Sequence, residues 1–269
     1  MQNTKPQATE AALITGASHG IGRCLAEEFA QRSIALVMVA LPSPELEESA
    51  DFLRQKYGIA VWTIASDLTQ DASAQEIFDF CQKYGIGIRY LCNNAGMGYT
   101  GKIENFSLDF LERLMKLNML ATVRLTHLFL PQLRQYPQSY ILNVASMAAL
   151  YDMPYKVVYS ASKAFVYSFS RALREELRGT GVSLTVLCPG GVATNAQVKA
   201  TVEKLGKMAK YLTASPEEVA ASAIKAMLGK KAVHIPKRLT RVYAGLRHVV
   251  PYGLQMRILG HFLGKKYRD

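Results

Sequence analysis

Short apolar runs alternate with longer amphipathic stretches along most of the chain. The apolar runs are continuous rather than alternating, which is typical of strands buried on both faces of a parallel sheet. They lie at 11–15, 34–40, 60–67, 89–95, 140–146, 182–189 and 232–236. The stretches between them predict helices at 20–32, 43–57, 72–84, 107–135, 157–179 and 216–229. This alternation predicts an α/β fold in three layers, doubly wound around a mostly parallel sheet of seven strands.

The pattern continues without a linker, an internal repeat or a low-complexity segment. We therefore expect a single domain over residues 1–269, with a basic amphipathic extension at about 237–269 that Pro251 interrupts. The formal net charge is +11, and residues 230–269 contribute +9 of it through ten basic residues and one acid. Any attraction of an acidic partner is therefore expected at the C-terminal end, and not at the nearly neutral remainder of the chain.

Three interpretations of this extension stay open. A basic, apolar helical segment is typical of a membrane surface contact. It could instead pack on a second subunit, in a homodimer or homotetramer, or attract a phosphate-bearing carrier such as coenzyme A or acyl carrier protein. Nucleic acid is not an expected partner, because no recognised nucleic-acid-binding module accompanies the charge.

The remaining bulk features point to a reducing compartment. The first residues, MQNTKPQATE, do not resemble a secretory signal, and no run of about 18 apolar residues predicts a spanning helix. Four scattered cysteines, without a CxxC pair or a nearby histidine at metal spacing, favour free thiols over disulfides or a metal site. We expect a cytoplasmic protein, with association to membranes left open.

A glycine-rich loop follows the first predicted strand and opens the first predicted helix. In TGASHGIG, Gly16 permits a tight turn, while Gly20 and Gly22 allow a pyrophosphate to approach the backbone at the helix N-terminus. A strand before the loop and a helix after it make a dinucleotide site credible, and the fold is then Rossmann-type.

A tyrosine and a lysine stand four residues apart in VVYSASKAF, on one face of a predicted helix. A group that works as an acid near neutrality needs a pKa close to 7, about three units below an ordinary tyrosine, or about 4 kcal/mol. One positive charge at about 4 Å provides on the order of 4 kcal/mol at an effective dielectric of 20. We therefore expect Lys163 to lower the pKa of Tyr159.

Six motifs in order resemble the compact branch of the short-chain dehydrogenase/reductase family. They are TGASHGIG, the SDL segment at 66–68, CNNAG at 92–96, Asn118 in KLNML, Ser146 with YSASK, and PGGVAT at 189–194. The resemblance covers about residues 10–235. It implies hydride transfer between a nicotinamide cofactor and a ketone or secondary alcohol. It also implies a catalytic tetrad of Asn118, Ser146, Tyr159 and Lys163.

The same resemblance implies a set of cofactor contacts. These are Gly16, Ser18, His19, Gly20, Ile21, Gly22, Asp67, Leu68, Asn94, Ala95, Gly96, Tyr159, Lys163, Val192 and Thr194. Ala40 stands where an acid that binds the NAD ribose is usual, and Leu41 where an arginine for NADP is frequent. Without a carboxylate to repel a 2′-phosphate, and with Ser18 and His19 able to bind it, we expect NADP(H) rather than NAD(H).

The residues around the predicted site indicate a hydrophobic carbonyl substrate, such as a 3-oxoacyl chain or a sterol-like ring. The expected pocket contains Met147, Leu150, Tyr151, Met153, Tyr155, Val192 and Met208. The alternative function is a cofactor-binding protein without catalysis, a sensor or scaffold. The intact tetrad favours the enzyme.

Overall fold

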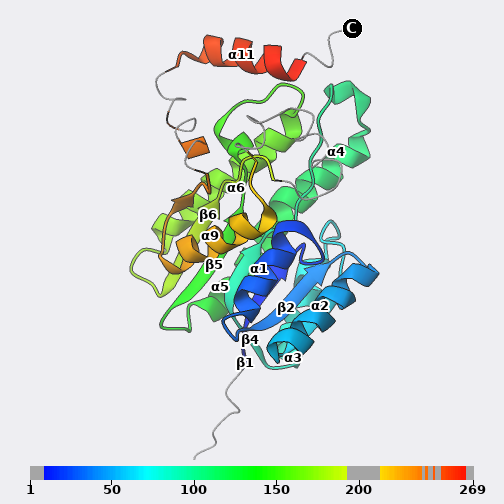
Figure 1. The fold of residues 1–269 in the computed structure, drawn as a ribbon, viewed down its shortest axis with the longest axis vertical. Coiled ribbons are helices and arrows are strands. Elements are labelled where there is room, and N and C mark those ends of the chain that lie inside the picture. Colours follow the sequence, from blue (N-terminus) through cyan, green and yellow to red (C-terminus); the bar gives the residue numbers. More distant parts are fainter. Residues whose placement is uncertain (1–8, 193–212, 238–239, 242–244, 246–249, 265–269) are drawn as a thin grey trace, which may run out of the picture.

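The computed structural model describes residues 9–192, 213–237, 240–241, 245 and 250–264. At its centre lies a parallel sheet of seven strands in the order β3-β2-β1-β4-β5-β6-β7 (Figure 1). The strands are β1 (Thr9–Thr15), β2 (Ala35–Ala40), β3 (Val61–Ala65), β4 (Ile86–Asn93), β5 (Ser139–Val144), β6 (Val182–Leu187) and β7 (Val233–His234). The doubly wound, Rossmann-type fold predicted from the apolar runs is therefore confirmed.

Helices cover both faces of the sheet. Those described are α1 (Gly20–Ala30), α2 (Pro44–Tyr57), α3 (Ser73–Lys83), α4 (Leu108–Met115), α5 (Ala121–Leu133), α6 (Val157–Glu176), α9 (Pro216–Leu228) and α11 (Tyr252–Gly264). One core joins α1, α2 and α9 to the sheet, and includes Leu25, Leu53 and Ile224. The other joins α3, α5 and α6, and includes Ile77 and Phe129. Buried apolar strands with a helix layer on each side explain why the strand sequences lack alternation.

The strand order reverses at β1, which pairs with β2 on one side and with β4 on the other. Loops that leave β1 and β4 at their carboxyl ends therefore turn to opposite faces of the sheet. In open sheets of this kind, ligands bind outside the carboxyl ends at such a switch point. The glycine loop follows β1 and the CNNAG segment ends β4, so the fold brings them together at this edge.

The predicted helix at 107–135 is the largest departure from the sequence-based expectation. The structure divides it into α4, a π-helical turn over Lys116–Leu120, and α5. Ser107 caps α4 by accepting a hydrogen bond from the backbone N–H of Phe110. The π turn surrounds Asn118, whose amide is bonded outside the helix, and such turns are frequent at functional sites.

Candidate active site

The glycine loop has the backbone geometry that a bound pyrophosphate requires. Gly16 and Gly20 have positive φ angles of 64° and 58°, which favour glycine. A Cβ atom placed on Gly22 would lie 2.1 Å from the carbonyl oxygen of Gly16. No side chain caps the N-terminus of α1, so its first N–H groups face the loop. A cradle that any larger residue would fill, at an uncapped helix N-terminus, fits the pyrophosphate of a dinucleotide.

The CNNAG segment is fastened to this loop by hydrogen bonds. The side-chain amide of Asn94 donates to the carbonyl of Thr15 at 2.8 Å. The hydroxyl of Thr15 accepts from the backbone N–H groups of Asn94 and Ala95, both at 2.9 Å. Sequence reasoning missed Thr15 as a site residue, although it directly precedes Gly16 and its hydroxyl binds both segments together.

The other predicted cofactor residues lie around the same edge. Ser18 Oγ and His19 Nδ1 are 2.9 Å apart. Asp67 accepts from the backbone and hydroxyl of Thr69, and the backbone hydrogen bond is the main cause that lowers the pKa of its carboxyl. Leu68 is buried and Ile21 packs against the core. These contacts fix the loops in which the residues lie.

Two predicted residues of the segment after β6 lie outside the part of the chain that the structure describes. They are Thr194, predicted to hold the nicotinamide, and Met208, predicted for the substrate pocket. Val192 is described and forms a bridge with Ala214. Its neighbour Gly191 accepts a hydrogen bond from the backbone of Ala214 at 3.0 Å. Val192 therefore lies beside the residues that lead into α9, and a contact between it and the cofactor stays a prediction.

Tyr159 and Lys163 project from the first turns of α6 against the segment after β4. A Cβ atom on Gly98 would lie 2.9 Å from the ring of Tyr159. A Cβ atom on Gly96 would lie 3.1 Å from both Lys163 Nζ and Asn118 Oδ1. Side chains at these two glycines would displace the groups that carry the predicted chemistry. Gly98 was not among the predicted site residues, and its place two residues after CNNAG is the only signal for it.

Asn118 is buried and has a partner for each polar atom of its side chain. Its amide nitrogen donates to the carbonyl of Met97 and to Ser162 Oγ, both at 2.9 Å, and its oxygen accepts from the N–H of Met97 at 2.9 Å. The π turn aims Asn118 at this backbone instead of at the helix before it. Ser162 also escaped the sequence analysis, although it directly precedes Lys163. The predicted solvent link through Asn118 stays a prediction.

Ser146 stands at the carboxyl end of β5, where it begins a short 3-10 turn, η3 (Met147–Leu150). Its hydroxyl accepts from the N–H of Ala148 at 3.1 Å. It also forms a hydrogen bond with Tyr159 that favours the ionised phenol. All four tetrad residues therefore meet at the carboxyl edge of the sheet, beside the glycine loop.

The electrostatic expectation for Tyr159 needs correction. Burial raises the pKa of the phenol above its ordinary value, and the hydrogen bond from Ser146 opposes this only in part. Lys163 is not among the causes of the shift, and its ammonium donates to the carbonyl of Val144 at 3.0 Å. Burial lowers the pKa of Lys163 to about 8. Desolvation thus outweighs the attraction between the two groups in this structure.

A second cation lies near the tyrosine. The ammonium of Lys156 is 5.7 Å from the centre of the Tyr159 ring, and burial lowers its pKa. Lys156 directly precedes α6, and its distance to the ring is within the range of a cation–π contact. Sequence reasoning did not single it out, because it stands three residues before Tyr159 in a segment without a motif.

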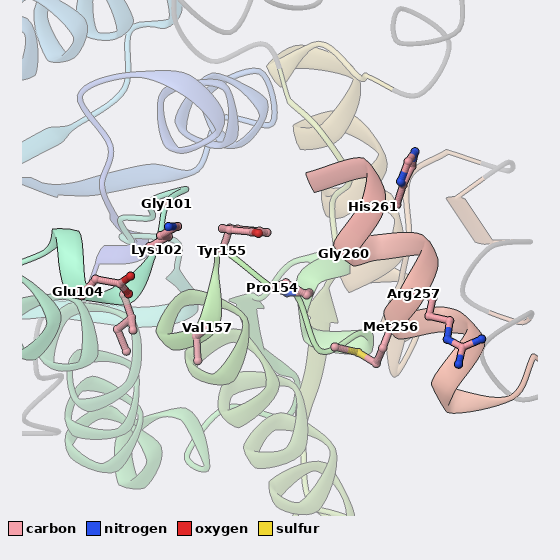
Figure 2. Close-up of a pocket in the computed structure, with 11 residues that line it drawn as sticks. Gly101, Lys102, Glu104, Pro154, Tyr155, Val157, Met256, Arg257, Gly260 and His261 are labelled. Carbon is pink, nitrogen blue, oxygen red and sulfur yellow. The ribbon is translucent and has the colours of Figure 1, made fainter. Parts of the chain in front are cut away.

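A cavity of about 640 Å³ lies next to Tyr155, one of the residues predicted to contact the substrate. Figure 2 shows it between the loop at Gly101–Glu104, the segment Pro154–Val157 and α11. Of the apolar residues predicted for the substrate, Tyr155 lines this cavity, whereas Leu150 is buried. Over the described residues, no helix combines the length and apolarity needed to cross a bilayer.

Comparison with known proteins identifies the family to which this geometry belongs. Residues 10–205 match the short chain dehydrogenase family model. Ketoacyl reductase HetN of Nostoc sp. is 32% identical over 81% of this chain and 75% of its own. The very-long-chain 3-oxoacyl-CoA reductase of Bos taurus is 32% identical over 82% and 69%.

A solved structure, a short-chain dehydrogenase from Sphingobium yanoikuyae in complex with NADPH, matches with a TM-score of 0.76. It is 29% identical and covers 90% of this chain and 96% of its own. The family indicated by the sequence match and by the fold match is the one that the arrangement of the four residues beside the glycine loop also indicates. This chain belongs to the short-chain dehydrogenase/reductase family and is an NAD(P)-dependent oxidoreductase that transfers hydride between nicotinamide and a ketone or secondary alcohol.

Proposed function

We propose that the enzyme uses NADPH to reduce the 3-oxo group of a long-chain acyl thioester. The names of two relatives, a ketoacyl reductase and a very-long-chain 3-oxoacyl-CoA reductase, support this substrate class. The cavity between α11 and the start of α6 supports it as well, because its walls combine apolar and basic side chains. A long acyl chain on a phosphate-bearing carrier would complement both kinds of surface.

The observation that carries the chemistry is the meeting of Ser146 and Tyr159 at the carboxyl edge of β5. Ser146 Oγ would donate a hydrogen bond to the ketone oxygen and stabilise the negative charge that develops there. Tyr159 would give its proton to that oxygen, and burial, which raises the pKa and keeps the phenol protonated, suits a proton donor. The reduced nicotinamide, when bound, supplies the hydride to the carbonyl carbon.

Lys163 and Asn118 would act on the cofactor and on Tyr159 rather than on the substrate. The ammonium of Lys163 lies against Gly96, on the cofactor side of the tyrosine, where it can bind ribose hydroxyls. The side chain of Asn118 binds both backbone groups of Met97, accepting from its N–H and donating to its carbonyl. This clamp would hold the segment 96–98 in place, against which the ring of Tyr159 packs.

A panel of carbonyl substrates tests the proposed class. Initial rates of NADPH oxidation should be highest with 3-oxoacyl thioesters of long chain, and should fall as the chain is shortened. A bulky ring ketone of similar hydrophobicity is the matched comparison. Faster reduction of the ring ketone, with no turnover of any thioester, would refute the substrate class and leave the reductase chemistry in place.

For the cofactor we propose a modest preference for NADP(H). The end of β2 carries no carboxylate, and Leu41 is exposed where a 2′-phosphate would lie. His19 and Arg23 line a depression next to the glycine loop, but Glu45 and Glu48 line it too. The two glutamates limit the attraction for a phosphate, which is why we expect a small margin. Fluorescence titration with both reduced cofactors measures it, and tighter binding of NADH contradicts it.

We further propose that the enzyme forms a homodimer or homotetramer. Leu108, Met115 and Leu120 are large apolar side chains on α4 and the π turn, and they are 70%, 37% and 40% exposed. Phe165 on α6 is also exposed. Apolar surface of this extent is typical of subunit contacts. Light scattering should give a mass of at least two chains, and Leu108→Glu should lower it.

We also propose that the chain is a single domain with a basic extension at 237–269. We propose that the enzyme is cytoplasmic and that this extension contacts a membrane surface. On α11, Leu254 and Ile258 are 50% and 46% exposed and lie one turn apart. An exposed apolar stripe beside basic residues supports peripheral binding to anionic lipid. Co-sedimentation with anionic vesicles at low salt tests it.

A further inference from the structure

The cavity next to α11 is built on the same segments that position Tyr159. The N–H of Gly101 donates to the carbonyl of Tyr155 at 2.8 Å, which joins the two loops that form its inner walls. The N–H of Val158 donates to Tyr99 Oη at 3.1 Å. Val157, two residues before Tyr159, is itself part of the wall. The wall of the cavity and the tyrosine are therefore carried by the same first turn of α6.

The walls of the cavity have a mixed character. Apolar surface comes from Ile103, Pro154, Val157 and Met256. In Figure 2, Met256 points from α11 toward Pro154 across the gap. Lys102 stands on the inner loop, and Arg257 and His261 stand on α11. Within the described residues, neither Lys102 nor Arg257 takes part in a salt bridge. Among the described residues of the lining, Glu104 is the single acid.

The backbone at Tyr155 is held in a conformation that few residues adopt. Its φ angle is 62°, in the left-handed region that disfavours a side chain as large as tyrosine. The hydrogen bond from Gly101 holds its carbonyl. As a result, the Tyr155 ring is directed toward α11, where it forms part of the cavity wall (Figure 2). Strain of this kind concentrates at ligand clamps.

α11 presents different residues to the cavity and to solvent. At about 100° per residue, Met256 and Gly260 lie on the side of the helix opposite Leu254 and Ile258. The first two line the cavity, and the last two are exposed. Arg257 lies between the two sides, at the rim. The helix is therefore a wall with a basic edge.

We propose that this cavity binds the coenzyme A portion of the acyl thioester. The inference rests on the proposed function and adds the place where the carrier is recognised. The pantetheine arm would lie over Ile103, Val157 and Met256, with the thioester directed to Tyr159. The phosphates would lie at the rim, between Lys102 and Arg257. Glu104 would weaken their binding.

We infer coenzyme A because its uncharged arm and its phosphates are joined in one molecule, as the apolar walls and the basic rim are joined in one cavity. A cavity of about 640 Å³ is in the range of small-molecule sites, about 300–1,000 Å³. A long uncharged arm that ends in several phosphates needs an apolar groove and a basic rim, and both are present. A free fatty acid carries one charge at the end nearest the reaction, which would place it next to Tyr159 and leave the rim without a partner.

The test compares two substrates that differ only in the carrier. The full-length enzyme with NADPH is assayed on a long-chain 3-oxoacyl-CoA and on the same acyl chain attached to unphosphorylated pantetheine. Arg257→Glu and Lys102→Glu should each raise the ratio of KM for the CoA substrate to KM for the pantetheine substrate by about tenfold. This corresponds to the loss of one exposed ion pair and the repulsion that replaces it. Glu104→Gln should lower the same ratio.

Lys83→Glu is the matched control. It introduces the same change of charge at the end of α3, which lies at the opposite end of the molecule from α11 (Figure 1). The ratio should stay at its wild-type value in this variant. An equal effect of Lys83→Glu and Arg257→Glu would show general electrostatics and overturn the proposed site.

Two further results separate this inference from the proposed function. If both thioesters are reduced and the ratio is unchanged in Arg257→Glu and Lys102→Glu, the enzyme is a thioester reductase and the carrier site is wrong. If neither thioester is reduced while a ring ketone is, the proposed function fails, and the carrier site fails with it.

Discussion

The two ends of the active site are built in opposite ways. At the catalytic end, Asn118 and Lys163 are 1% and 5% exposed, and their polar atoms have protein partners. At the C-terminal end, the wall of the cavity is an amphipathic helix with Leu254 and Ile258 half exposed. Proton transfer needs groups held in one geometry by a packed core, whereas recognition of a substrate tail can use a surface helix. The difference predicts that changes at the two ends affect different steps.

The largest effect is expected from Tyr159→Phe at the catalytic end. The ring still packs against Gly98, but it has no proton to give. The turnover number should fall by about 10³-fold, the middle of the range for general acid catalysis, while cofactor affinity changes little. Stopped-flow single-turnover assays with NADPH measure both quantities. More than a tenth of wild-type turnover on a true substrate would show that another group supplies the proton.

Lys163→Met should change turnover and folding stability in opposite directions. Turnover should fall by about 10²-fold or more, and cofactor affinity should weaken. The folded state should become more stable near neutral pH. Burial lowers the pKa of Lys163 from 10.5 to about 8, so the buried positive charge destabilises the folded state by at most on the order of 3 kcal/mol. Thermal unfolding followed by circular dichroism measures the difference.

The same variant predicts a pH dependence with a definite sign. Below about pH 8 the lysine is protonated in both the folded and the unfolded state, so the cost of burying its charge is fully present. Between about pH 8 and 10.5 the folded state releases the proton first, and the cost diminishes. The Tm difference between Lys163→Met and wild type should therefore narrow as pH rises through this range. A constant difference would mean that Lys163 is not a buried charge.

A smaller effect is expected at the adenosine edge. Ala40→Asp should shift the ratio of NADH to NADPH affinity by about tenfold or more in favour of NADH, because the carboxylate accepts from a 2′-hydroxyl and repels a 2′-phosphate. The matched variant is Leu41→Arg at the exposed neighbouring position, which should move the ratio the other way. Fluorescence titration gives both ratios, and an unchanged ratio in the two variants would place the ribose elsewhere.

Truncation after Pro236 tests the C-terminal extension, where the smallest free-energy change is expected. It removes eight basic residues and one acid, which takes the formal net charge from +11 to +4. The full chain should co-sediment with anionic vesicles at low salt, at about 1 kcal/mol per engaged basic residue, and the truncated chain should not. Reduction of a small ketone should persist, because the tetrad precedes the cut. A full-length protein that stays in the supernatant refutes membrane binding, and a change in oligomer mass would favour a subunit contact.

Much of the fold could be predicted because the sheet is buried on both faces, so its strands appear as apolar runs. Boundaries were less certain where local chemistry decides them. The strand predicted at 89–95 begins earlier, at Ile86, because Gly87 weakens the apolar signal. The strand predicted at 232–236 contains only the two residues Val233–His234, which pair with β6 on one side. An edge strand needs fewer backbone bonds, and its sequence is correspondingly short.

The four residues of the predicted tetrad, which the fold brings to one edge of the sheet, could be selected from sequence because each stands in a motif with fixed spacing. The residues that support it could not. Thr15, Gly98 and Ser162 act through backbone contacts and a few local hydrogen bonds, which leave no periodic pattern in the sequence. The shift of the Tyr159 pKa was predicted in the wrong direction, because charge spacing along a helix is visible in a sequence and the depth of burial is not.

The π turn at Lys116–Leu120 has a further consequence for insertions and deletions in this region. A π turn contains one residue more than the α-helix that would replace it. Deleting one residue here would let α4 and α5 join in a regular helix without rotating one against the other, and the wide turn that directs Asn118 out of the helix would be lost. Asn118 would then lose Met97 and Ser162 while the apolar packing of α5 is retained. At this position the loss of a single residue would inactivate the enzyme before it unfolds the protein.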